Sequence, residues 1–291
     1  MQNDILYTDI DSKIFDLSEL SYQIDTSINH WEPNCSYFLS SSELGRGLSK
    51  KDINNKISYI MNNTGHRCDD IKNLDIAQHN ILFAGCSTTF GDGLPYETTW
   101  DHLLYDEIKK DHKNIGPFHS LGYPGGSASK IIMNVFKYCN NFGNPNEIFI
   151  LLPDYARTIK YDSQNREISP DLFLNYLENK IIGNSNLEEM FFEFQNYCRI
   201  LETYCKSNNI SLYISSWDEA TTEVAKKINL KTFYSLDFEK RKEYIDTFDI
   251  QHDSLQKNKE YLLNARDKNH FGIIFHQWFK DSFHRWRKID D

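Results

Sequence analysis

The sequence predicts a three-layer α/β/α domain built around a mainly parallel central sheet. Short apolar runs at 81–84 and 147–152 have the length and composition of strands that are covered on both faces. Segments with apolar residues at helical spacing lie between runs of this kind. Such strand–helix alternation is typical of a parallel sheet with helices on both faces.

The first half of the alternation centres on two strands and one helix. The strand at 81–84 ends in a Gly/Ser/Thr cluster, which must turn away from the sheet. Thr98 or Thr99 can cap a helix whose apolar residues recur at helical spacing, namely Trp100, Leu103, Leu104 and Ile108. A short strand at 119–123 follows and ends in the Pro-Gly-Gly-Ser turn at 124–127.

The second half continues the pattern around an irregular insertion. A polar segment at 155–186 follows the strand at 147–152, and we expect it to lie near the rim of the functional site. The other predicted elements are a helix over about 128–140, an amphipathic helix over 187–206, a strand over 210–215 and a helix over 218–228. After a loosely patterned stretch, the last helix carries Ile273, Ile274, Trp278 and Phe279.

These elements place the main domain at residues 79–291. Residues 1–78 are polar and lack clear periodicity, although aromatic side chains are scattered through them. We expect them to form an N-terminal extension packed on the main domain, with a small helix near 51–61. The same extension could serve assembly with other proteins.

Composition excludes several function classes. The 291 residues are 40% hydrophobic and 14% aromatic, as in a folded protein, and their net charge of −10 disfavours binding to nucleic acid. No run of about 18 apolar residues predicts a membrane span. Six cysteines show neither CxxC pairs nor a zinc-ligand rhythm, and no phosphate-binding glycine motif follows a strand. We therefore expect no metal and no cofactor.

The N-terminal residues and the amino-acid bias of the chain predict where the protein is located. No basic region followed by an apolar stretch opens the sequence, so a cytoplasmic protein is expected. The bias towards Asn, Asp, Lys and Ile resembles translated AT-rich genomes, which include many phages. A virion-associated protein is the alternative.

Two distant segments could supply nucleophilic chemistry. Ser87 follows the first strand between two glycines, and open α/β sheets bind ligands at the carboxyl ends of their strands. A serine hydroxyl needs a base, and the base needs a third group to orient it. Asp267 and His270, three residues apart before the last helix, could be that orienter and base. The structural alternatives are a turn-filling serine and an aspartate that caps a helix.

A double glycine after the second strand could complete the site. Gly125 and Gly126 could present a backbone N–H to a developing oxyanion, or could simply make the turn.

The segments around Ser87, Gly125 and Asp267–His270, in this order along the chain, resemble the SGNH (GDSL-like) hydrolase superfamily. Gly85-Cys86-Ser87 is similar to its nucleophile block, Gly125 to the second-block glycine, and Asp267-x-x-His270 to the last block. Gly65-His66-Arg67 also resembles a lead-in seen in some subgroups. The resemblance covers about residues 60–285. It implies a flavodoxin-like fold, a Ser87–His270–Asp267 triad, and an oxyanion hole formed by the backbone N–H groups of Ser87 and Gly125.

The third block of the family pattern differs here. The family often has Gly-x-Asn-Asp after the third strand, whereas this chain has Pro153 where the Asn would fall. Proline offers no donor, and loss of one oxyanion donor costs about 10²–10³ in rate. Asp154 and Arg157 could line the substrate pocket; their alternative roles are a helix cap and a surface ion pair.

The leading hypothesis is a serine esterase or deacetylase that acts on small acyl esters, including O-acetylated carbohydrate. The alternative is a binding or structural module of this fold with weak or absent catalysis, such as a virion component. Acyl transfer to a glycan is a third option, because the same acyl-enzyme could be resolved by a sugar hydroxyl.

Overall fold

The computed structural model of the chain describes residues 33–39, 57–157, 160–161, 167–168, 184–248 and 259–290. Most of the expected helix near 51–61 and most of the insertion at 155–186 lie outside the described residues. No helix in the described part of the chain is both long and apolar enough to cross a membrane.

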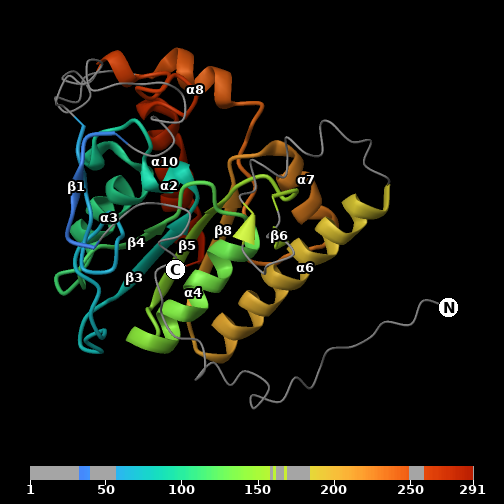
Figure 1. Ribbon diagram of the computed structural model, residues 1–291, viewed down its shortest axis with the longest axis horizontal. Helices are drawn as coiled ribbons and strands as arrows, with labels where there is room; N and C mark the ends of the chain where they lie inside the picture. The colour runs from blue at the N-terminus through green and yellow to red at the C-terminus, as the bar shows by residue number, and fades with distance from the viewer. Residues whose placement is uncertain are drawn as a thin grey trace.

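The central sheet has four parallel strands (Figure 1). In spatial order they are β4 (His119–Gly122), β3 (Ile81–Gly85), β5 (Glu147–Leu152) and β8 (Ser211–Ser216). Gly85 at the end of β3 pairs with Gly122 on one side and with Leu151 on the other, and Leu151 pairs with Ser215. The carboxyl ends of all four strands therefore lie along one edge. The predicted parallel sheet is confirmed.

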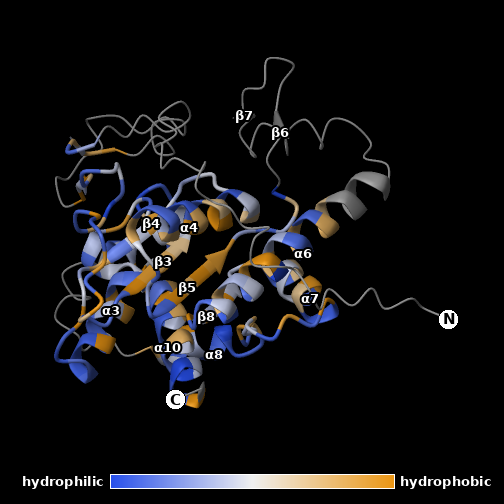
Figure 2. Ribbon diagram, turned by 90° about the horizontal axis from the view of Figure 1, so that it is seen from below, coloured by the Kyte–Doolittle hydropathy of each residue, from blue (hydrophilic) through white to orange (hydrophobic). Residues whose placement is uncertain are grey.

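Helices cover both faces of this sheet, as the apolar runs predict. Alternate residues of β3 enter different core clusters: Leu82 and Ala84 enter one, and Ile81 and Phe83 the other. The first cluster includes residues of α4 (Ala128–Phe142), α6 (Asn184–Ser207) and α7 (Glu219–Lys227), and the second includes residues of α3 (Trp100–Asp111) and α10 (Ile273–Asp290). Figure 2 shows the apolar strands β3 and β5 between these two groups of helices. The three-layer fold class is thus confirmed.

The start of α3 differs from the expected threonine cap. Thr99 occupies the N-cap position, but its side chain accepts nothing from the helix, and its hydroxyl donates to the carbonyl of Tyr96. The backbone N–H of Trp100 instead donates to Nδ1 of His276 on α10, at 3.0 Å. A residue far along the chain therefore satisfies the first turn of α3.

Short elements complete the described structure. They are β1 (Ser36–Tyr37), β2 (Tyr59–Ile60), α2 (Ser87–Phe90), η4 (Tyr96–Thr98), β6 (Lys160–Tyr161), β7 (Glu167–Ile168), α8 (Arg241–Thr247) and η5 (Lys259–Tyr261). Strands β1 and β2 pair antiparallel. Ile57, Tyr59 and Met61 share a core cluster with Phe90, the last residue of α2, and with Leu94. The described residues before 79 thus pack against the segment that follows Ser87, and the boundary at 78 stays a prediction.

Candidate active site

Ser87 is the first residue of α2 and follows β3 after one intervening residue, Cys86. The carbonyl of Cys86 accepts the backbone N–H groups of Thr89 and Phe90, both at 3.0 Å, so the chain turns from strand to helix without a loop. A Cβ on Gly85 would lie 1.9 Å from Oγ1 of Thr89, which leaves room for glycine alone. Ser87 is 8% exposed at the carboxyl edge of the sheet.

A buried arginine holds the loop that follows α2. Arg67 donates through Nη1 to the carbonyls of Phe90 and Gly91, each at 3.1 Å, and through Nη2 to the carbonyls of Ser58 and Leu94, each at 3.0 Å. Burial lowers the pKa of the guanidinium, and nearby Tyr59, Tyr96 and acidic groups oppose that effect. One cation thus fixes four carbonyls around the nucleophile turn. Arg67 belongs to the Gly-x-Arg segment noted in the sequence.

The Asp267 segment docks directly on this loop. Gly93, with φ +74°, accepts the N–H of Arg266 at 2.9 Å through its carbonyl. A Cβ on Gly93 would lie 2.9 Å from the nitrogen of Arg266 and 3.3 Å from that of Asp267. The two segments approach this closely because position 93 has no side chain. The structure therefore brings the Ser87 turn and the Asp267 turn to the same end of the sheet.

Asp267 and His270 form a tight pair. Oδ2 of Asp267 lies 2.6 Å from Nδ1 of His270, and its Oδ1 accepts the backbone N–H groups of Asn269 and His270 at 3.0 Å. Burial opposes ionisation of Asp267, but the hydrogen bonds and charge of His270 outweigh it and lower the pKa of Asp267 to about 2. The carboxylate is therefore ionised at neutral pH and fixes Nδ1 as a donor.

The remaining ring nitrogen of His270 lies near a second carboxylate. Its Nε2 is 3.9 Å from Oδ2 of Asp92, a residue that the sequence patterns did not single out. Oγ of Ser87 makes a long contact of 4.0 Å to Sγ of Cys86, and within the described ranges it forms no hydrogen bond with His270. The Ser87–His270 contact thus stays a prediction, whereas the Asp267–His270 contact is present.

Gly125 lies in the turn that follows β4. The N–H of Tyr123 donates to the carbonyl of Gly85 at 2.9 Å, which joins this turn to the end of β3. Gly125 has φ +74°, and a Cβ built on it would meet nothing within 4 Å. Open space beside a left-handed glycine suits an oxyanion donor, and this role stays a prediction.

The loop after β5 is tied to the end of β8. The carbonyl of Pro153 accepts the hydroxyls of Ser216 and Thr221, each at 3.4 Å. Oδ1 of Asp154 accepts the N–H of Ala156 at 2.9 Å, so this side chain caps a turn. Burial, with a smaller contribution from Asp218, raises the pKa of Asp154.

Trp217 connects this loop to the nucleophile turn. Its Nε1 donates to Sγ of Cys86 at 3.3 Å, and its ring lies 5.8 Å from that of Phe271 between centroids. The guanidinium of Arg157 lies 5.5 Å from the Trp217 ring centroid, a cation–π distance. Sequence reasoning missed Trp217; its place directly after β8 in a parallel sheet was the available signal. Arg157 thus reaches the site through Trp217, and its substrate role stays a prediction.

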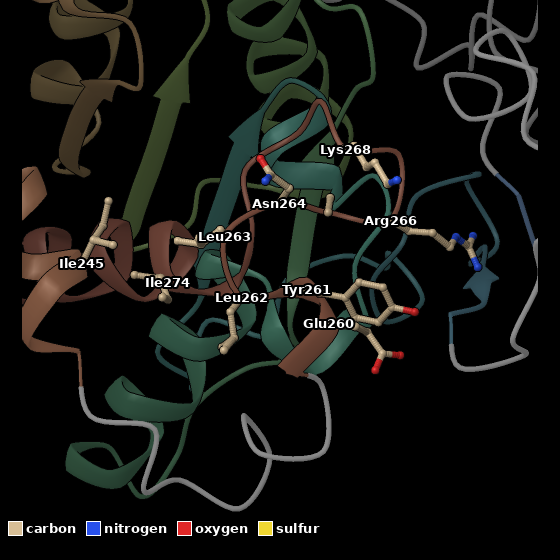
Figure 3. A pocket seen from close by; sticks show the side chains of 10 residues that line it. Ile245, Glu260, Tyr261, Leu262, Leu263, Asn264, Arg266, Lys268 and Ile274 are labelled. Atoms are coloured by element: carbon tan, nitrogen blue, oxygen red, sulfur yellow. The ribbon is translucent and has the colours of Figure 1, made fainter.

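The groove in Figure 3 lies beside the site. It has a volume of about 830 Å³ and is lined by residues of the 260–268 segment, Ile245 and Ile274, but not by Ser87, Asp267 or His270. Arg266, one of the lining residues, donates through Nη2 to the carbonyl of Phe38 at 2.7 Å. The groove is therefore separate from the Ser87 and Asp267–His270 side chains.

One cluster of potential metal ligands lies at the opposite end of the sheet. His79, His112 and Glu147 each offer a ligand atom, and these atoms lie within 4.8 Å of one another. Arg287 donates to Glu147 at 2.8 Å and to Nε2 of His112 at 2.7 Å. Nε2 of His79 also contacts Oε1 of Glu147, so these four side chains form one hydrogen-bonded network.

Comparisons with solved structures return esterase-like proteins at low identity. A lipolytic protein of the G-D-S-L family from Desulfitobacterium hafniense DCB-2 is 13% identical, with a TM-score of 0.41, over 72% of this chain and 99% of that chain. The psychrotrophic esterase EstA from Pseudoalteromonas sp. is 11% identical, with a TM-score of 0.40, over 72% and 100%. The acetyl xylan esterase Est2A from Butyrivibrio proteoclasticus is 8% identical, with a TM-score of 0.35, over 57% of each chain.

No protein-family model matches the chain, and neither does any curated protein.

Proposed function

We propose that the chain is a serine esterase that cleaves small acyl esters through Ser87, His270 and Asp267. The observation that carries the proposal is the Asp267–His270 pair, held at 2.6 Å and docked through Gly93 onto the loop that follows Ser87. A carboxylate-oriented imidazole that can reach a serine hydroxyl at the end of a strand would activate that hydroxyl for acyl transfer.

The proposed reaction has two halves. Nε2 of His270 accepts the proton of Ser87 as Oγ attacks the acyl carbon, and the imidazolium then protonates the leaving alcohol. Water repeats the sequence and releases the acid. Asp267 keeps the proton on Nδ1 and stabilises the imidazolium, and the backbone N–H groups of Ser87 and Gly125 bind the oxyanion.

The acyl and alcohol groups would meet the surface formed by Trp217, Arg157 and Asp154. An aromatic ring beside the nucleophile turn suits the apolar face of a small ester or a sugar. Acetyl esters of carbohydrate remain our preferred substrate class, and transfer of the acyl group to a glycan is the variant in which a sugar hydroxyl replaces water.

Covalent labelling tests the proposal. A fluorophosphonate probe should label the purified protein, mass spectrometry should locate the adduct on Ser87, and p-nitrophenyl acetate should be hydrolysed. Ser87→Ala should lose both signals, whereas Thr88→Ala, which removes the neighbouring hydroxyl, should keep the adduct. A wild-type protein that neither labels nor hydrolyses would end the enzyme proposal.

A binding or structural module is the second candidate, and two observations favour it. Pro153 stands where the family pattern has an oxyanion-donating Asn, and Ser87 forms no hydrogen bond with His270 in the described structure. This candidate predicts no adduct on Ser87 together with a stable assembly that survives Ser87→Ala, which size-exclusion chromatography with light scattering would measure.

A further inference from the structure

His270 lies between two carboxylates, one at each ring nitrogen. Asp267 holds Nδ1 at 2.6 Å, and Oδ2 of Asp92 lies 3.9 Å from Nε2. The Asp92 side chain is 0% exposed and that of His270 is 15% exposed, so water screens this second contact poorly. The serine triad uses only one of these two carboxylates.

Backbone contacts in the loop that follows Ser87 fix the position of Asp92. The N–H of Asp92 donates to the carbonyl of Ser87 at 3.1 Å, which places Asp92 one turn beyond the serine. Gly91 and Gly93 flank it with φ of +75° and +74°, and Arg67 holds the carbonyl of Gly91. The Asp92 side chain is fully buried in this loop.

The other titratable groups around His270 are few in the part of the chain that the structure describes. Arg67 is near enough to Asp92 for their charges to interact. His276 is close to both His270 and Arg67, but burial lowers its pKa to about 3, and its Nδ1 accepts the N–H of Trp100. His276 is therefore neutral, and in the described structure Asp267 and Asp92 are carboxylates within 4 Å of the His270 ring nitrogens.

We propose that Asp92 is a positioning residue for the reaction: it holds Nε2 of His270 towards the nucleophile loop and stabilises the imidazolium that forms when His270 takes the serine proton. The inference rests on the proposed esterase function. An opposite charge at this distance favours the protonated ring, so Asp92 strengthens His270 as a base and also makes it retain its proton to higher pH.

The pH profile of kcat/KM for p-nitrophenyl acetate tests the role of Asp92. Asp92→Asn keeps the size of the side chain and removes its charge. We expect the acidic limb of the profile to move down by about 1 pH unit or more, while the plateau rate falls because the weaker base removes the proton less well. Asp106→Asn, which removes an exposed carboxylate on α3, should leave the limb unchanged. A folded Asp92→Asn protein with the wild-type limb would overturn the proposal.

Histidine NMR gives a readout that does not need activity. In Ser87→Ala protein, the titration midpoint of the His270 ring should lie above the ordinary value of about 6.5 and should fall when Asp92→Asn is added. If Asp92→Asn does not fold, Asp92→Ser also removes the charge and should lower the His270 midpoint in the same way. A midpoint at or below about 6.5 in the parent protein would refute the inference.

The two proposals can fail separately. A labelled Ser87 with an Asp92-independent profile would remove the role of Asp92 and keep the esterase. Absence of labelling, together with a His270 midpoint that depends on Asp92, would remove the esterase and keep the electrostatic coupling.

Discussion

The contact between the two halves of the site should be most sensitive at Gly93. Gly93→Ala places a methyl group 2.9 Å from Cβ of Ala265 and 2.9 Å from the nitrogen of Arg266, at φ +74°. The left-handed backbone alone costs about 1–2 kcal/mol for a residue with a Cβ, and forcing an extra methyl into a packed contact adds about 1–3 kcal/mol. We therefore expect the free energy of unfolding to fall by about 2–5 kcal/mol.

Gly125→Ala is the matched control for stability. Gly125 has the same φ of +74°, but its Cβ would meet nothing within 4 Å, so this variant should lose about 1–2 kcal/mol from backbone strain alone. Urea unfolding followed by circular dichroism measures both values. The difference between the two variants isolates the cost of separating the 265–267 segment from the nucleophile loop.

Gly93→Ala should also reduce the rate at which the protein hydrolyses p-nitrophenyl acetate. A shift of the Asp267–His270 pair by about 1 Å would cost about 10²-fold in kcat, because catalytic groups work only within a narrow geometry. Equal losses of stability in the two glycine variants, with wild-type kcat for Gly93→Ala, would show that the segments do not depend on this contact.

Three further predictions follow from the described geometry. Asp267→Asn should lower kcat by roughly 10²–10⁴ with little change in KM, because the Nδ1 partner at 2.6 Å no longer fixes the tautomer; steady-state kinetics on p-nitrophenyl acetate checks this. Trp217→Ala should raise KM about tenfold while Ser87 keeps its fluorophosphonate adduct, and an unchanged KM would remove Trp217 from the substrate surface. Burial first, then His79 and Arg287, lower the pKa of His112, so the folded state binds fewer protons there than the unfolded chain and stability present above about pH 6.5 should decline as the pH falls. Urea midpoints at pH 7 and pH 5 should differ less in His112→Gln than in wild type, and an equal difference would contradict the assignment.

The sheet could be predicted because its strands are short and buried on both faces. Residues 81–85 and 147–152 carry apolar side chains at almost every position, and the structure divides them between two core clusters. Ser87 begins α2 two residues after the end of β3, and its place at the carboxyl edge of the sheet follows from parallel pairing without knowledge of side-chain contacts.

Long-range partners could not be read from the sequence. The cap of α3 comes from His276 rather than Thr99, because a residue distant in the chain packs onto the helix end and displaces the local choice. Asp92 sits between two glycines in a loop, where an aspartate is usually a surface turn residue. Its burial beside Arg67 and His270 depends on how three separate segments pack, and no local pattern reports that.

The order of the site along the chain has a consequence for biosynthesis. Cys86, Ser87 and the loop held by Arg67 can assemble from neighbouring residues as soon as β3 has partners, whereas the imidazole arrives with a turn made far later and seated by Gly93. A truncated chain that ends before residue 265 would contain Ser87 but would lack Asp267, His270 and α10, whose side chains form part of the second core cluster. Any chemistry that needs both Ser87 and His270 should therefore appear only in the last folding step, when the turn at 265–270 and α10 pack together onto the sheet.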